Sequence, residues 1–344
     1  MNQPVRSDDL AGAASARIPN RLSSISRPGG HSAGRGCPSP SLGRDIDDRQ
    51  RRPIVSKRPQ RIEGRHRRKN RARRRAHTKL GYGIIVQRAS TLPSIAMAQP
   101  STDLTGRIAL VTGGSRGIGR AICLALADAG ADVAVNYRER AEDAEMVVNA
   151  IRTANRRAMA VAADVSQGES VRKMVERIAG ELGPIDILIN NAGTGRIRGL
   201  DELDEAEFDR TIAINLKSAF LCTQAVLRFM RQRRWGRIVN ISSAAARGPG
   251  IVGVHYNASK AGLEGLTRGY ASRLAKEDIT VNAVAPGPIE TELAEPLKEM
   301  SVASRIPVGR FGTTDEVAQA VLMVIGNPFM TGQTIALNGG MLFS

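Results

Sequence analysis

Short apolar runs alternate with amphipathic stretches throughout residues 101–344. Runs of Val, Ile, Leu and Ala without polar alternation predict strands buried on both faces, as in parallel sheets. The stretches between them have the apolar spacing of helices, as at residues 120–129 before Gly130. This alternation predicts one α/β domain with a doubly wound, seven-stranded parallel sheet and right-handed crossovers. The predicted strands are residues 107–111, 132–138, 158–161, 185–189, 236–241, 279–284 and 333–337.

Residues 1–100 have a different composition. They contain 22 Lys and Arg against 6 Asp and Glu, a net charge of +16, so nearly all of the whole chain's +17 lies here. Pro, Gly, Ser and Arg are abundant and Tyr82 is the one aromatic residue, so this segment cannot bury enough apolar surface to offset the entropy lost on ordering. We predict a disordered basic extension over residues 1–100 and one folded domain over residues 101–344.

The basic extension has three interpretations. The run from Arg65 to Arg75 could neutralise nucleic-acid phosphates, but it lacks the interleaved aromatic residues that stack on bases. A transit peptide is rich in Arg and Ser but poor in acidic residues, and Asp45, Asp47 and Asp48 argue against it. The simplest interpretation is that translation starts at Met97, shortly before the first predicted strand. We favour this interpretation over nucleic-acid binding and targeting.

A glycine-rich loop, Thr112–Gly119, follows the first predicted strand and leads into a helix. Strand, glycine turn and helix N-terminus together present backbone N–H groups and the positive end of a helix dipole to a pyrophosphate. Tight strand–helix turns also use glycine for steric reasons alone. The strand before and the helix after this loop nevertheless favour nucleotide binding.

Tyr256 and Lys260 are four residues apart, which places them on one face of a helix. An ammonium group close to a phenol favours the phenolate and lowers the tyrosine pKa from about 10, which suits proton transfer to a carbonyl. Ser243 follows a predicted strand, at the edge where open parallel sheets bind ligands. We expect His255 in a loop lining the mouth of this site.

Residues 104–344 resemble a short-chain dehydrogenase/reductase, closest to the 3-oxoacyl-(acyl-carrier-protein) reductases. The family motifs appear in order as T-G-x-x-x-G-x-G at 112–119, N-N-A-G at 190–193, and P-G-x-I-x-T at 286–291. The resemblance implies a Rossmann-type fold and four catalytic residues. Tyr256 would protonate the carbonyl oxygen, Ser243 would hydrogen-bond it, and Lys260 would lower the tyrosine pKa and reach the nicotinamide ribose. Asn215 would hold a water of a proton relay, satisfy helix backbone, or both.

The resemblance also implies binding of a nicotinamide cofactor. NAD enzymes usually place an acidic residue at the end of the second strand, where this chain has Asn136, and Arg116 and Arg138 lie nearby to meet a 2′-phosphate. We therefore predict NADPH rather than NADH. Asp164 is expected near the adenine or as a strand-end cap. The predicted cofactor-binding residues are Thr112, Gly113, Ser115, Arg116, Gly117, Ile118, Gly119, Asn136, Tyr137, Arg138, Asp164, Val165, Asn191, Ala192, Gly193, Tyr256, Lys260, Pro286, Gly287, Ile289 and Thr291.

The predicted function is NADPH-dependent reduction of a 3-oxoacyl thioester or a similar ketone. Arg234 matches one position at which related reductases bind acyl carrier protein, but Glu277 occupies the second, and the lid at residues 292–305 is short. Oxidation of a sugar or secondary alcohol is therefore a serious alternative. A non-catalytic NADP-binding sensor or scaffold is a further alternative, although the chain keeps Ser243, Tyr256 and Lys260.

Other features of the sequence narrow the setting. An apolar span long enough to cross a membrane and a secretory signal pattern are both missing, so we predict a cytoplasmic enzyme. Cys37, Cys123 and Cys222 have neither disulfide nor metal spacing, so no metal site is predicted and the last two are expected to be packed thiols. We expect a homotetramer, or at least a dimer, built from the helices that follow Asn215 and contain Tyr256.

Overall fold

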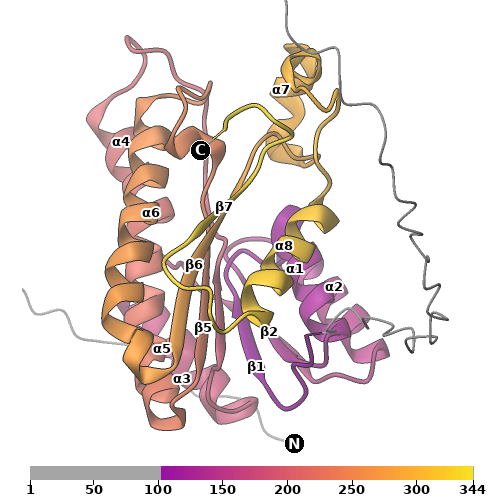
Figure 1. The fold of residues 1–344 in the computed structure, drawn as a ribbon. Helices are drawn as coiled ribbons and strands as arrows, with labels where there is room; N and C mark the ends of the chain where they lie inside the picture. The colour runs from indigo at the N-terminus through magenta and orange to yellow at the C-terminus, as the bar shows by residue number, and fades with distance from the viewer. Residues whose placement is uncertain (1–101, 344) are drawn as a thin grey trace, which may run out of the picture. The chain divides into compact units, whose positions relative to one another are not determined.

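Seven parallel strands form the centre of the structure, a computed structural model that describes residues 102–343 apart from the side chains of Leu293 and Glu299. The predicted disordered extension and the start at Met97 lie outside the described residues. The strand order is β3-β2-β1-β4-β5-β6-β7, which confirms the predicted doubly wound sheet (Figure 1). The strands are β1 (Ile108–Val111), β2 (Asp132–Tyr137), β3 (Ala158–Ala162), β4 (Ile187–Asn190), β5 (Gly236–Ile241), β6 (Ile279–Pro286) and β7 (Thr334–Leu337).

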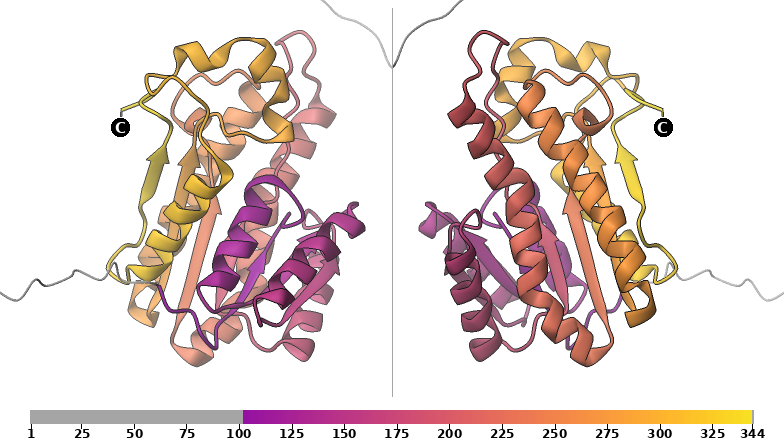
Figure 2. Two further views of the ribbon diagram at one scale, coloured as in Figure 1. Left: turned by 90° about the vertical axis from the view of Figure 1, so that its right-hand side faces the viewer. Right: turned by 90° about the vertical axis from the view of Figure 1, so that its left-hand side faces the viewer.

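Helices cover both faces of the sheet, as Figure 2 shows from its two sides. One hydrophobic cluster packs α1, α2 and α8 against one face, and a second packs α3, α5 and α6 against the other. The central strands β1, β4, β5 and β6 are buried throughout because both faces are covered, whereas the edge strand β7 is only partly buried. The helices are α1 (Gly117–Asp128), α2 (Ala141–Thr153), α3 (Gly168–Glu181), α4 (Glu205–Ile212), α5 (Ser218–Arg233), α6 (Val254–Leu274), α7 (Glu295–Glu299) and α8 (Thr314–Gly326).

The first helix begins earlier than the sequence indicates. We expected it from Arg120, but α1 begins at Gly117, so the glycine turn runs directly into the helix. The chain order of the strands reverses between β1 and β4. In open α/β sheets ligands bind at the carboxyl ends of the strands at such a point.

A ladder of buried polar side chains fixes α6 to the sheet. The Asn190 amide donates to Oδ1 of Asn240 at 2.8 Å, and the Asn240 amide donates to Oγ1 of Thr267 at 2.8 Å. Thr267 in turn donates to the Leu263 carbonyl at 2.9 Å. Buried hydrogen-bonded side chains of this kind specify one packing arrangement. The ladder therefore sets where α6 lies relative to β4 and β5.

Four smaller observations complete the fold. Cys123 and Cys222 are buried, as predicted for packed thiols. A third hydrophobic cluster, Ala294, Val302, Ile306 and Phe311, lies in the segment that contains α7. Over residues 102–343 no helix is both long and apolar enough to cross a membrane, and no group of potential metal ligands occurs in the same range.

Candidate active site

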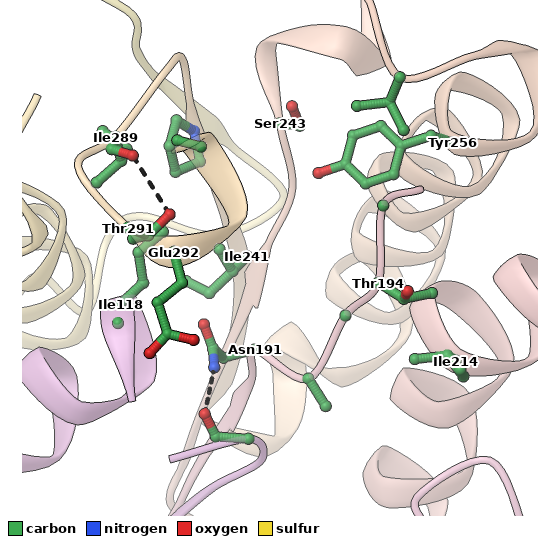
Figure 3. Close-up of a pocket in the computed structure, with 18 of the residues that line it drawn as sticks. Ile118, Asn191, Thr194, Ile214, Ile241, Ser243, Tyr256, Ile289, Thr291 and Glu292 are labelled. Atoms are coloured by element: carbon green, nitrogen blue, oxygen red, sulfur yellow. Dashed lines mark hydrogen bonds between the residues drawn. The ribbon is translucent and has the colours of Figure 1, made fainter. Parts of the chain in front are cut away.

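A cavity of about 1010 Å³ opens beside the carboxyl ends of β1, β4, β5 and β6. It lies where the strand order reverses, as the fold leads one to expect. All but two of the predicted site residues line it, the exceptions being Thr112 and Asn215. Figure 3 shows that the lining side chains come from the glycine loop, the segment after β4, the end of β5, α6 and the segment after β6.

The glycine loop is a cradle that side chains would fill. A Cβ on Gly119 would lie 2.2 Å from the Gly113 carbonyl oxygen, and a Cβ on Gly113 would lie 3.1 Å from Cα of Ala192. Gly113 also has φ +61° and Gly117 has φ +51°, where a side chain is strained. The loop therefore packs backbone against backbone at the N-terminus of α1. This geometry fits the pyrophosphate of a nicotinamide dinucleotide.

Thr112 holds the glycine loop from behind. Its hydroxyl accepts from the backbone N–H groups of Asn191 at 2.9 Å and Ala192 at 3.0 Å. The Asn191 amide donates to the carbonyls of Thr112 and Gly113 at 2.9 and 3.0 Å. Thr112 is buried and does not line the cavity, so it supports the loop, and its role in binding the cofactor stays a prediction. It joins the loop to the N-N-A-G segment.

Asn136 has a similar supporting position. Its Oδ1 accepts from the Gly113 N–H at 3.2 Å, and its amide donates to the carbonyls of Val161 and Ala163, each at 3.2 Å. The side chain is 2% exposed and ties the glycine loop to β3. The sequence predicts that Asn136 faces the ribose. It does line the cavity, together with Tyr137, the last residue of β2, and Arg138, but its side-chain hydrogen bonds are all made to backbone groups.

The arginines near this end of the cavity are ion-paired. Arg138 pairs with its neighbour Glu139, whereas Arg116 pairs with Glu292. Arg140 Nη2 lies 3.3 Å from the same Glu292 oxygen. Sequence reasoning missed Arg140 and Glu292. Their signals were the position of Arg140 just after β2 and of Glu292 directly after the P-G-x-I-x-T motif.

The Ser243 and Tyr256 hydroxyls lie side by side in the cavity (Figure 3). Ser243 Oγ also accepts from the Ala245 N–H at 3.1 Å, which fixes the serine at the end of β5. Burial raises the pKa of Tyr256, and a hydrogen bond with Ser243 opposes that rise. The phenol is therefore protonated at neutral pH.

Lys260 lies near the Tyr256 ring and is bound to a backbone carbonyl. Its Nζ donates to the Ile241 carbonyl at 2.8 Å and lies 5.7 Å from the centroid of the Tyr256 ring. Burial is the largest influence on the pKa of Tyr256, and the lowering of that pKa by Lys260 stays a prediction. Burial also lowers the pKa of Lys260 itself, to about 8.

Stability should depend on pH through Lys260. The folded protein gives up the lysine proton near pH 8, whereas the unfolded chain keeps it to about pH 10.5. Between these values the unfolded state binds more protons, so the free energy of unfolding rises with pH, by about 3 kcal/mol in all. Lys260→Met should lack this rise. Urea unfolding at about pH 7 and about pH 10 measures it.

The control for this experiment is Lys173→Met, because Lys173 is exposed on α3. This variant should follow the wild-type protein over the whole pH interval. A constant stability difference between wild type and Lys260→Met across the interval would contradict the prediction.

Asn215 supports the segment that covers Tyr256. It lies in a π-helical turn, Ala213–Lys217, between α4 and α5. Its amide donates to the Thr194 carbonyl at 2.9 Å and accepts from the Thr194 N–H at 2.8 Å. A Cβ on the next residue, Gly195, would lie 3.3 Å from the Tyr256 ring. The side chain thus positions this segment, and the proton relay stays a prediction.

His255 and Asp164 complete the comparison with the sequence. His255 was expected in a loop at the mouth, but it is fully buried in the first turn of α6 and does not line the cavity. Asp164 lines the cavity and also accepts from the N–H and hydroxyl of Ser166, at 2.9 and 2.7 Å. It therefore caps the end of β3 while facing the cavity.

Comparison with known proteins decides the family. The short chain dehydrogenase family matches residues 107–301. The chain belongs to the short-chain dehydrogenase/reductase family. It is therefore an oxidoreductase acting on CH–OH and C=O groups, and the family implies a nicotinamide cofactor. The cradle at Gly113–Gly119 fits that cofactor.

Relatives of this short-chain dehydrogenase/reductase span the same domain. This chain is 39% identical to a Synechocystis 3-oxoacyl-(acyl-carrier-protein) reductase over 244 residues, and the match covers 70% of this chain and 99% of the relative. It is 42% identical to the Staphylococcus aureus reductase FabG over 241 residues, covering 68% and 97%. A short-chain dehydrogenase/reductase structure from Mycobacterium marinum is 36% identical with a TM-score of 0.67, covering 70% of this chain and 97% of that one.

Proposed function

We propose that this protein is an NADPH-dependent carbonyl reductase that converts a 3-oxoacyl thioester or a similar ketone to the alcohol. The observation that carries the proposal is the pair of hydroxyls, Ser243 and Tyr256, in one cavity with the glycine cradle. Relatives about 40% identical are named 3-oxoacyl-(acyl-carrier-protein) reductases, which supports the substrate class.

The reduced nicotinamide supplies a hydride when the cofactor is bound. Tyr256 donates its phenolic proton to the carbonyl oxygen, and Ser243 donates a hydrogen bond to that oxygen as negative charge develops. Because burial raises the pKa of Tyr256, the phenol holds its proton until charge appears on the substrate. Lys260, 5.7 Å from the ring centroid, stabilises the phenolate that remains.

A separate question is whether the substrate is bound to acyl carrier protein. Arg234 and Glu277 lie before β5 and β6, at the amino edge of the sheet, whereas Ser243 follows β5 at the carboxyl edge. Arg231 pairs with Glu277 at 2.7 Å and Arg234 lies 3.7 Å from Asp278, so acidic side chains compensate the charge there. This favours a carrier-free ketone, or the oxidation of a sugar or secondary alcohol, as the second candidate.

A substrate panel tests the proposal. The protein is mixed with NADPH and acetoacetyl groups carried on coenzyme A or on acyl carrier protein, β-keto esters, diketones or sugars, and loss of nicotinamide absorbance is followed. We expect turnover with a 3-oxoacyl compound. Turnover only of a carrier-free ketone, or only of alcohols when NADP⁺ is supplied, would establish the second candidate. Cofactor binding without turnover of any compound would identify a sensor or scaffold.

We expect tighter binding of NADPH than of NADH. Arginines pair strongly with phosphate, and Arg116, Arg138 and Arg140 line the cavity near the end of β2. Replacing Arg116 and Arg138 together by alanine should weaken NADPH binding by about tenfold to a hundredfold and leave NADH binding nearly unchanged. Fluorescence titration measures both affinities, and Arg140→Ala reports on the third arginine. Equal affinities of the unmodified protein for the two cofactors would refute the preference.

We further propose a homotetramer, or at least a dimer, built on α5 and α6. Ala258 and Ala261 are exposed on α6, and small side chains let helices approach closely. Phe220 on α5 is 44% exposed, which leaves apolar surface to be covered. Sedimentation at micromolar concentration should show the oligomer, and a monomer alone would overturn this assignment.

A further inference from the structure

The Glu292 carboxylate lies inside the cavity that the glycine loop borders. Figure 3 shows it reaching from the segment after Thr291 toward Ile118 and Asn191. It makes ion pairs with Arg116, the N-cap residue of α1, and with Arg140, which precedes α2. One acidic side chain thus joins two arginines from two different loops.

The two arginines meet where a dinucleotide carries its adenosine ribose. The pyrophosphate binds at the N-terminus of the first helix, and the ribose lies at the end of the second strand. Arg116 approaches that point from the helix and Arg140 from the strand end. Arg138, the other arginine after β2, is paired with Glu139. Arg140 also lies 3.4 Å from Asp143, so Glu292 is the carboxylate that Arg116 and Arg140 share.

We propose that Glu292 is a specificity-determining residue whose carboxylate competes with the 2′-phosphate of the cofactor for Arg116 and Arg140. This inference rests on the proposed use of NADPH. A phosphate that enters must displace the carboxylate, since the arginine donors cannot serve both anions at full strength, and the two anions repel each other. NADH has a hydroxyl in place of the phosphate, so it can bind without displacing the Glu292 carboxylate from the two arginines. Glu292 accordingly narrows the preference for NADPH.

The competition is modest in size because the partners are partly exposed. The side chains of Arg116, Arg140 and Glu292 are 51%, 49% and 59% exposed, so solvent screens each pair. Glu292 is also the first residue of the lid at residues 292–305.

The test compares Glu292→Gln with Glu290→Gln. The first keeps the size of the side chain and removes the charge. The second removes a carboxylate two residues away that does not line the cavity. Dissociation constants are measured for NADPH, NADH, and the fragments 2′,5′-ADP and AMP, which carry the adenosine half with and without the 2′-phosphate. Repeating the titrations in high salt shows whether the effect is electrostatic.

We expect Glu292→Gln to bind NADPH and 2′,5′-ADP about fivefold more tightly, with NADH, AMP and all values for Glu290→Gln within about twofold of wild type. An unchanged or weaker NADPH affinity in Glu292→Gln overturns the inference, as does an equal gain for NADH. If wild type and Glu292→Gln both fail to prefer NADPH, the proposed cofactor is wrong and the inference falls with it. If wild type prefers NADPH and Glu292→Gln does not differ from it, the inference alone falls.

Discussion

Replacing Tyr256 by phenylalanine is expected to lower turnover by about three orders of magnitude or more. The ring is retained, so packing against Gly195 and the cavity wall should be preserved. The proton that the carbonyl oxygen needs is lost, and Ser243 cannot replace it because its hydroxyl is a far weaker acid. Affinity for NADPH should stay within about twofold of wild type, since no charged group is removed. Steady-state rates and cofactor titration measure the two effects separately.

Tyr270→Phe is the matched control for this variant. Tyr270 is also on α6, but its hydroxyl accepts a hydrogen bond from Gln224 at 2.8 Å and does not line the cavity. Its loss should leave turnover unchanged. Retention of most activity in Tyr256→Phe would show that another group is the proton donor.

Gly119→Ala is expected to weaken cofactor binding strongly. The added methyl group would lie 2.2 Å from the Gly113 carbonyl oxygen and 2.6 Å from the Asn191 amide, so the loop must move. Moving it also breaks the bonds from Asn191 to the loop, and we expect affinity to fall by about a hundredfold and stability by about 1–3 kcal/mol. Titration with NADPH and urea unfolding measure the two losses.

The control here is Gly180→Ala on α3, where a Cβ would meet nothing within 4 Å. Alanine inside a helix should raise the free energy of unfolding by about 0.5–1 kcal/mol and leave cofactor affinity alone. Wild-type affinity in Gly119→Ala would mean that the loop tolerates a side chain and that the steric argument is wrong.

Local patterns were enough to predict the sheet and most of the cavity lining. Short spacings in the sequence place most of the site residues. A strand–turn–helix unit places Gly113 and Gly119, a strand end places Ser243, and a single helix places Tyr256 and Lys260. The structure contains these local elements, and the residues line one cavity as predicted.

The supporting roles could not be predicted in the same way. Thr112 and Asn136 have polar side chains in the correct motif positions, but they face backbone groups that other strands bring close. Thr112 faces the segment after β4 and Asn136 faces β3, which depends on how β1 pairs with β4 and β2 with β3. Burial, which decides the pKa of Tyr256, is likewise a property of the packed molecule. The link from Glu292 to Arg116 joins positions far apart in the chain.

The segment that closes the cavity beyond Thr291 has a hydrophobic core of its own, made by Ala294, Val302, Ile306 and Phe311. The glycine loop, Ser243 and Tyr256 belong to other elements, whose side chains pack in the two clusters beside the sheet. The C-terminal residues pack on this core, since Met341 contacts it and the Val308 N–H donates to the Gly339 carbonyl at 3.1 Å. Substrate range can therefore diverge during evolution through residues 292–311 and their C-terminal partners, while the proton-transfer geometry is inherited unchanged.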